Sequence, residues 1–148
     1  MTDKYQHILL AIDFSEQSEL IAAKAKELSR LYRAKLSIVH VLDNIAMPDT
    51  AYDTVIPLDQ DSHDEALEAE KNKLIDIADS LDIDRNCRWL VWGVPKQEII
   101  QVADEQQADL IVVGSHGRHG LELLLGSTAN AILHHANCDV IAVRLRDA

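Results

Sequence analysis

Short, unbroken apolar runs alternate along this chain with longer segments whose apolar residues recur every three or four positions. The first run, Ile8 to Ile12, is followed by Asp13 and by Ser15, a residue type that caps helices. Such a run is typical of a strand buried on both faces, and the spacing after it predicts an amphipathic helix of about three turns. The apolar positions of this helix are Ile21, Ala25, Leu28 and Tyr32.

The same alternation continues to the end of the chain. Further strands are expected at residues 35–41, 87–92, 109–114 and 140–143. Further helices are expected at residues 62–81, from Pro95 with Ile99, Val102 and Ala103 buried, and after Thr128 with Ala129, Ile132, Leu133 and Ala136 buried. Residues 43–61 show no clean period and contain two prolines, which predicts a surface loop whose role the sequence does not indicate.

This order of elements predicts a Rossmann-like α/β fold, an open parallel five-stranded sheet with helices on both faces. A chain of 148 residues suits one domain spanning residues 1–148. In such sheets a ligand binds outside the carboxyl ends of the strands, where the strand order reverses. We therefore expect the site at the loops after the first and fourth strands.

Charge and composition limit the classes of molecule that the protein is expected to bind. With 25 acidic and 14 basic residues the formal charge is -11, which repels nucleic acid and anionic membrane surfaces. A small anionic ligand is still compatible with this field where backbone amides reverse it locally.

The N-terminal residues do not resemble a secretory signal, and no apolar run approaches the ~18–20 residues that span a bilayer, so a cytoplasmic protein is expected. Cys87 and Cys138 do not form a CxxC pair, which favours buried free thiols.

A glycine-rich segment between the fourth strand and the last helix carries the most specific chemistry. Glycines let the backbone approach a ligand, free amides at a helix start attract phosphate oxygens, and hydroxyl and guanidinium groups add donors. These features predict an anion-binding loop, whereas the plain alternative is a tight turn in which Ser127 only caps the helix. The residues concerned are Gly114, Ser115, Gly117, Arg118, Gly126, Ser127 and Thr128.

Other phosphate and metal motifs are missing from the sequence. There is no GxxxxGK[ST] segment, and no GxGxxG follows the first strand, which excludes a P-loop enzyme and an ordinary dinucleotide-binding domain. His116 and His119 lack a third metal-binding side chain within their segment, so no metal ligand is assigned. Asp13 could contact a ribose hydroxyl or only cap the first helix.

Taken together, these motifs resemble the universal stress protein family over the whole chain. The resemblance rests on Ala11-Ile12-Asp13-Phe14-Ser15, His40-Val41, Gly93-x-Pro95 and the terminal Gly114-x2-Gly117 and Gly126-Ser127 elements. It implies an adenine nucleotide alpha hydrolase-like fold that binds ATP, AMP or ADP, with Mg²⁺ as a further candidate. Ala11, Ile12 and Asp13 would belong to the nucleotide site, with Asp13 in contact with the ribose or neighbouring atoms. The backbone near Val41 would meet adenine, and the glycine-rich segment would line the phosphates.

One departure concerns the length of the loop. The nucleotide-binding members have the pattern G-x2-G-x9-G-[ST], whereas eight residues separate Gly117 from Gly126 here. Gly120 could absorb the difference, or the shorter loop could favour a mono- or diphosphate. The retained glycines and Ser127 argue against the branch of the family that has lost nucleotide binding.

The resemblance implies a stress-response regulatory protein whose partners sense nucleotide occupancy. It also implies a homodimer formed through the terminal strand, Val140 to Leu145. Two alternatives stay open: a dimeric adaptor that binds no nucleotide, and a slow ATPase or self-phosphorylating protein. Asp13 and Glu122 are the nearby acidic candidates for turnover, but they form no recognisable catalytic pair, and no catalytic residue is assigned.

Overall fold

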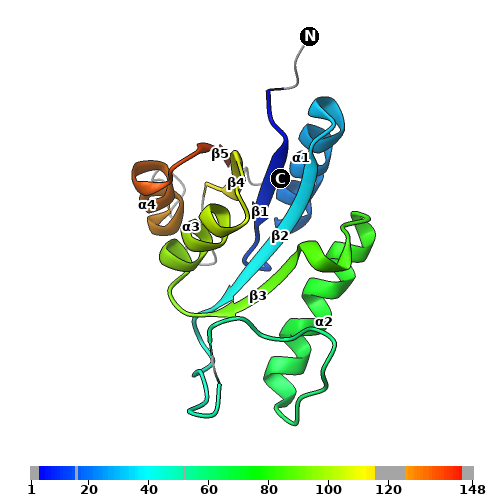
Figure 1. Ribbon diagram of the computed structural model, residues 1–148, viewed down its shortest axis with the longest axis vertical. Helices are drawn as coiled ribbons and strands as arrows, with labels where there is room; N and C mark the ends of the chain where they lie inside the picture. Colours follow the sequence, from blue (N-terminus) through cyan, green and yellow to red (C-terminus); the bar gives the residue numbers. More distant parts are fainter. Residues whose placement is uncertain (1–3, 16, 52, 116–125, 145–148) are drawn as a thin grey trace.

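The computed structural model describes residues 4–15, 17–51, 53–115 and 126–144 (Figure 1). They form one sheet of five parallel strands in the order β3-β2-β1-β4-β5. The strands are β1 (His7–Ala11), β2 (Lys35–Leu42), β3 (Arg88–Trp92), β4 (Leu110–Gly114) and β5 (Asp139–Val143). The Rossmann-like α/β fold expected from the alternation of apolar runs and amphipathic segments is confirmed.

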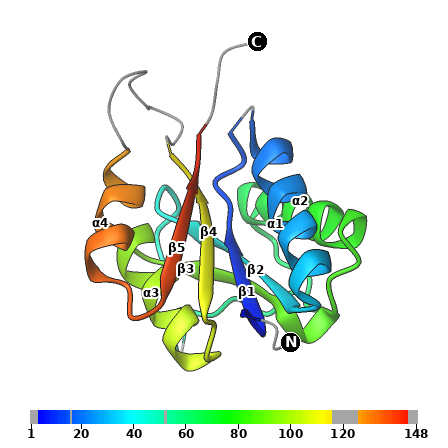
Figure 2. The ribbon, with the colours of Figure 1, turned by 90° about the horizontal axis from the view of Figure 1, so that it is seen from above.

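Four α-helices of the described residues cover the two faces of this sheet (Figure 2). On one side lie α1 (Ser18–Tyr32) and α2 (Glu65–Ser80), and on the other lie α3 (Pro95–Glu105) and α4 (Ser127–His135). A short 3-10 helix, η1 (Arg85–Cys87), leads into β3. Alternate strand residues enter separate cores: Ile8 and Leu10 pack on the α1 and α2 side, Leu9 and Ala11 on the α3 and α4 side.

The central strand explains why unbroken apolar runs mark the strands. Ile8, Leu9 and Leu10 are each 0% exposed, because helices cover both faces of β1. Complete burial of each such side chain contributes roughly 1.5–3 kcal/mol before conformational entropy is subtracted. This buried strand fixes the position of the residues that follow its carboxyl end.

The start of the first helix differs from the prediction. α1 begins at Ser18 with Gln17 as its N-cap residue and no side-chain cap, so Ser15 does not cap it. Phe14 has a φ of 58°, a left-handed conformation that turns the chain between β1 and the helix and places Ser15 outside the first turn. The alternative in which Asp13 caps α1 is wrong for the same reason.

Four smaller expectations are also corrected. Cys87 lies in η1 rather than in β3, although it is buried as a free thiol; Cys138 is only half-buried. Leu133 is 44% exposed, because the buried face of α4 is narrow and consists of Ala129 and Ile132. The second helix begins at Glu65, where the Asp64 side chain accepts hydrogen bonds from two backbone amides.

The expected surface loop after β2 is confirmed, with one additional feature. Thr54, Val55 and Ile56 run antiparallel along the outer edge of β3 and form a single bridge between Val55 and Val91. The Ile56 amide donates to the Leu90 carbonyl at 2.8 Å. The loop therefore covers part of an edge strand that would otherwise expose its hydrogen-bonding groups.

Within the described ranges, every helix is too short or too polar to cross a lipid bilayer.

Candidate functional site

The candidate site lies at the carboxyl edge of three neighbouring strands. β1 pairs with β2 on one side and with β4 on the other, so the strand order reverses at β1 (Figure 2). Leu10 is level with Val112 and Ala11 with Val39, which brings the residues after β1 close to the ends of β2 and β4. This reversal is where parallel α/β sheets bind ligands.

Val41 offers its peptide group to this edge. The Ile12 amide donates to the Val39 carbonyl at 3.0 Å, so the peptide groups of Val39 and Val41 both point toward β1. The next rung would join the Val41 amide to the Ile12 carbonyl, but β1 has already ended and the pairing stops at Ala11. Within the described part of the chain no hydrogen bond satisfies the Val41 amide.

The His40 ring, rather than the Val41 amide, forms the hydrogen bond to the Ile12 carbonyl. Its Nδ1 lies 2.7 Å from the Ile12 carbonyl oxygen, and since a carbonyl only accepts, Nδ1 carries the proton. The ring is buried and stacks on Phe14 with centroids 4.0 Å apart. On its other side, Nε2 lies 3.8 Å from Oε2 of Glu70 in α2. His40 thereby links the loop after β1 to both β2 and α2.

Sequence reasoning assigned no role to His40, Phe14 or Glu70. A lone histidine inside an apolar strand was the available signal, because a buried polar ring needs partners. Its partners come from a loop and from a helix about thirty residues further on, which no local pattern links.

Asp13 sits at the centre of the edge and forms its own turn. Its Oδ1 accepts the Ser15 amide at 3.0 Å, and the described residues supply no further hydrogen bond to the carboxylate. The side chain is half-buried. One carboxylate oxygen is thus fixed by the backbone, and the other is free to accept a hydrogen bond from a ligand.

On the β4 side, two short bonds hold the ends of the glycine-rich segment together. The Ser115 amide donates to the Val143 carbonyl at 2.8 Å, and the Ser115 carbonyl accepts the Gly126 amide at 2.7 Å. Ser115 is buried at 7% exposure. The first residue of α4 therefore lies beside the end of β4, as an anion-binding loop between them requires.

The start of α4 carries amides that its own helix does not use. Gly126 is the N-cap residue, no side chain of the described part caps the helix, and the first intrahelical bond runs from the Asn130 amide to the Gly126 carbonyl at 2.9 Å. Ser127 and Thr128 occupy the first two helical positions, so Ser127 is not the capping residue. Their amides and hydroxyls can donate to an anion.

The structure brings most of the predicted residues to one edge of the sheet. Those with described positions are Ala11, Ile12, Asp13, Val41, Gly114, Ser115, Gly126, Ser127 and Thr128. Gly117 and Arg118 lie outside the described residues, as do His116, His119 and Glu122. Over the described ranges, no three histidine, cysteine, aspartate or glutamate side chains are close enough to hold a metal ion.

Comparisons with known proteins agree with this geometry. The model of the universal stress protein family matches residues 4–144. Universal stress protein A homolog 2 of Coxiella burnetii is 40% identical over 145 residues, which cover 97% of this chain and 98% of that protein. Its homolog 1 from the same organism is 38% identical over 146 residues, covering 97% and 99%.

Solved structures share the fold. The structure of protein MJ0577, a universal stress protein of Methanocaldococcus jannaschii, superposes with a TM-score of 0.74 at 25% identity and covers 97% of this chain and 99% of that one. A universal stress protein solved in complex with cAMP superposes with a TM-score of 0.67 at 22% identity and covers 95% and 97%.

Proposed function

The chain belongs to the universal stress protein family, and from this premise we propose that it is a stress-response regulatory protein that binds ATP or a related adenine nucleotide. The proposed site is the carboxyl edge of β1, β2 and β4. The observation that carries the proposal is the free Val41 amide, one residue beyond His40 and two residues past the last β1–β2 pair, Ala11 with Val39.

An unpaired strand amide suits the recognition of a purine. The Val41 peptide group presents a donor and an acceptor side by side, the pattern that the hydrogen-bonding edge of adenine complements. His40 occupies the Ile12 carbonyl that would otherwise pair with this amide. The ring of His40 therefore keeps the Val41 amide available to the base.

The remaining parts of the nucleotide match the other groups at the edge. The free oxygen of the Asp13 carboxylate can accept a ribose hydroxyl, as acidic residues do in related α/β sheets. The uncapped start of α4 offers amides and the Ser127 and Thr128 hydroxyls to the phosphates. Mg²⁺ would then be held mainly by the phosphates and water, as is usual for this ion.

Direct tests begin with the protein as purified. Denaturing fresh protein should release an adenine nucleotide that chromatography identifies, and calorimetry of the emptied protein with ATP, ADP and AMP, each with and without Mg²⁺, should rank the phosphates. Absence of released nucleotide together with no heat of binding at high protein concentration would exclude the proposal. Heat of binding with AMP and ADP but not with ATP would indicate that the one-residue-shorter loop leaves no room for a triphosphate.

Regulation rather than turnover is the proposed consequence of binding. The described edge offers Asp13 as its acidic group, without a second group arranged as a base or water-orienting partner. Phosphate release above a buffer control, abolished by Asp13→Ala, would favour the alternative of a slow ATPase. We further propose a homodimer through β5, of which Val140 to Val143 are described and Leu145 is not.

A further inference from the structure

The pairing between β1 and β2 ends before β2 does. Its last pair is Ala11 with Val39, whereas β2 continues to Leu42. The Val41 amide, which points toward β1, lies just beyond this last pair. Whether Val41 is open to a ligand therefore depends on what stops the pairing here.

One further pair, Asp13 with Val41, would close this edge of the sheet. In a parallel ladder that pair requires the Val41 amide to donate to the Ile12 carbonyl and the Phe14 amide to donate to the Val41 carbonyl. The backbone donor and acceptor of Val41 would then both be used within the chain. Asp13 would also leave the turn in which it accepts the Ser15 amide. The longer pairing is therefore incompatible with the proposed contacts to base and ribose.

Two stacked rings prevent this extra pair. The His40 Nδ1 donates to the Ile12 carbonyl at 2.7 Å, so the acceptor that the pair needs is bonded to a side chain instead. Phe14 has a φ of 58°, outside the β region, which turns its amide away from the ladder. The centroids of the His40 and Phe14 rings are 4.0 Å apart, so the two obstacles support each other.

Helix α2 holds both rings from outside the sheet. Oε2 of Glu70 lies 3.8 Å from Nε2 of His40, and the Lys73 ammonium lies 5.8 Å from the centroid of the Phe14 ring. Glu70 and Lys73 are three positions apart, so they lie on one side of the helix. Contacts from a single element thus keep the two rings in place.

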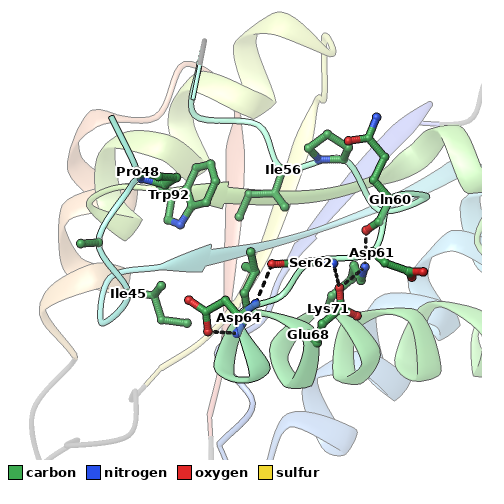
Figure 3. Close-up of a pocket in the computed structure, with 13 residues that line it drawn as sticks. Ile45, Pro48, Ile56, Gln60, Asp61, Ser62, Asp64, Glu68, Lys71 and Trp92 are labelled. Atoms are coloured by element: carbon green, nitrogen blue, oxygen red, sulfur yellow. Dashed lines mark hydrogen bonds and ion pairs between the residues drawn. The ribbon is translucent and has the colours of Figure 1, made fainter. Parts of the chain in front are cut away.

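The loop after β2 fixes α2 in turn. Lys71, the residue after Glu70, is 4% exposed and donates to the Gln60 carbonyl and to Oε1 of Glu68 (Figure 3). A buried ammonium bonded to the loop resists rotation of the helix about its axis, because rotation would leave the charge without partners. Glu70 is thereby kept beside His40.

We propose that His40 is a positioning residue for the nucleotide base: its ring ends the β1–β2 pairing at Ala11 and so holds the backbone donor and acceptor of Val41 open. Without the ring donor, the Ile12 carbonyl is released and the pairing extends by one pair, which withdraws Val41 from the base. The ligand in this inference rests on the proposed function, whereas the length of the pairing is a property of the protein alone.

NMR of the nucleotide-free protein tests the pairing directly. A coupling across the hydrogen bond between the Val41 amide nitrogen and the Ile12 carbonyl carbon should be absent in wild type and present in His40→Leu, which lacks the donor. His40→Asn places an amide nitrogen where Nδ1 lies and should behave as wild type. His7→Leu is the matched control: it removes a second buried strand histidine, at the opposite edge of the sheet, and should produce no coupling.

Calorimetry measures the consequence for the ligand. His40→Leu should weaken ATP and AMP by the same factor, about five- to tenfold, because the lost contact is to the base and not to the phosphates. His40→Asn and His7→Leu should stay within about twofold of wild type.

The two measurements separate this inference from the proposed function. A wild type that binds no nucleotide would remove the proposed function, and the NMR result would still decide whether His40 ends the pairing. The inference is overturned if His40→Leu shows no coupling between Val41 and Ile12, if it shows the coupling yet binds ATP as tightly as wild type, or if His40→Asn acquires the coupling.

Discussion

Asp13 is held by its own loop rather than by the helix that follows it, which leaves its charge for a ligand. Its Oδ1 accepts the Ser15 amide, and the left-handed Phe14 between them completes the turn. Asparagine can keep this turn, since its side-chain oxygen also accepts an amide. Alanine cannot, so the two substitutions separate the turn from the charge.

We expect Asp13→Ala to weaken ATP binding by about tenfold or more, because a hydrogen bond to a charged group contributes roughly 1.5–3 kcal/mol. Asp13→Asn should fall between this variant and wild type. Calorimetry gives both affinities, and thermal melting without nucleotide controls for damage to the turn. Unchanged affinity in Asp13→Ala would show that the carboxylate does not contact the nucleotide.

Gly93 is a second residue whose backbone sets the local structure. It has a φ of 143°, and an added Cβ would lie 2.7 Å from Cγ of Glu98. We expect Gly93→Ala to lower the free energy of unfolding by about 1–3 kcal/mol. Urea denaturation measures the change, and Gly93→Ala combined with Glu98→Ala should recover only the steric part. Wild-type stability in Gly93→Ala would refute the argument from φ.

At the scale of elements, His7 joins two strands and the end of a helix at the amino edge of the sheet. Its Nδ1 donates to the Gln106 carbonyl at 2.9 Å, and its Nε2 lies 2.6 Å from the Ser37 hydroxyl. Burial lowers the pKa of His7 from its ordinary value of 6.5, because the charged ring loses water that these neutral partners do not replace.

This pKa shift predicts a pH dependence of stability. As the pH falls, His7 is protonated at a higher pH in the unfolded chain than in the folded protein. The free energy of unfolding should therefore fall as the pH drops through 6.5 toward the lower pKa of the folded state. The His7→Gln variant cannot titrate at this position. Urea titrations from about pH 8 to about pH 5 should show wild type losing stability relative to the variant. Parallel curves for the two proteins would contradict the assignment.

The strands and the start of α3 at Pro95 were predictable to within about one residue, whereas the start of α1 and the side-chain contacts were not. An unbroken apolar run such as Ile8 to Ile12 reflects burial on both faces, which is a local property of the sequence. The start of α1 depends on the left-handed Phe14, a conformation that the residue type does not signal.

Some features of the candidate site could also be predicted from the sequence, and others could not. Asp13, Ser115 and Ser127 could be found because they follow a strand or precede a helix. The unpaired amide of Val41 depends on the register between β1 and β2, and the contacts of the His40 ring depend on a loop and on a distant helix. Neither feature leaves a pattern along the chain.

For the molecule as a whole, the net charge is negative, whereas the groups at the proposed site are hydrogen-bond donors that attract an anion. The formal charge of -11 repels nucleotides at long range. Nucleotide binding at the proposed site would therefore rest on short-range donors at the start of α4 and the end of β2, which are screened little by salt once a ligand is seated. Nucleotide association should accordingly be faster, rather than slower, as ionic strength rises.

The last prediction concerns the outer edge of β5, which pairs with no other strand of the described residues, and the assembly of two chains through it. The Val143 carbonyl points toward β4, where it accepts the Ser115 amide, so the alternate residues Val140 and Ala142 point their peptide groups away from the sheet. Within the chain, β5 is anchored separately, since the Tyr5 hydroxyl donates to Asp139 Oδ2 at 2.7 Å. Pairing between copies can therefore be removed without releasing the strand.

We expect Ala142→Pro to convert a dimer into a monomer, because proline removes an outward amide and edge strands tolerate it. Ile141→Pro is the matched control: it removes an inward amide that bonds β4, and should lower the melting temperature as well. Light scattering after size exclusion gives the mass, and circular dichroism confirms the fold. A dimer that survives Ala142→Pro with unchanged dissociation would place the interface elsewhere, and a monomeric wild type would exclude it.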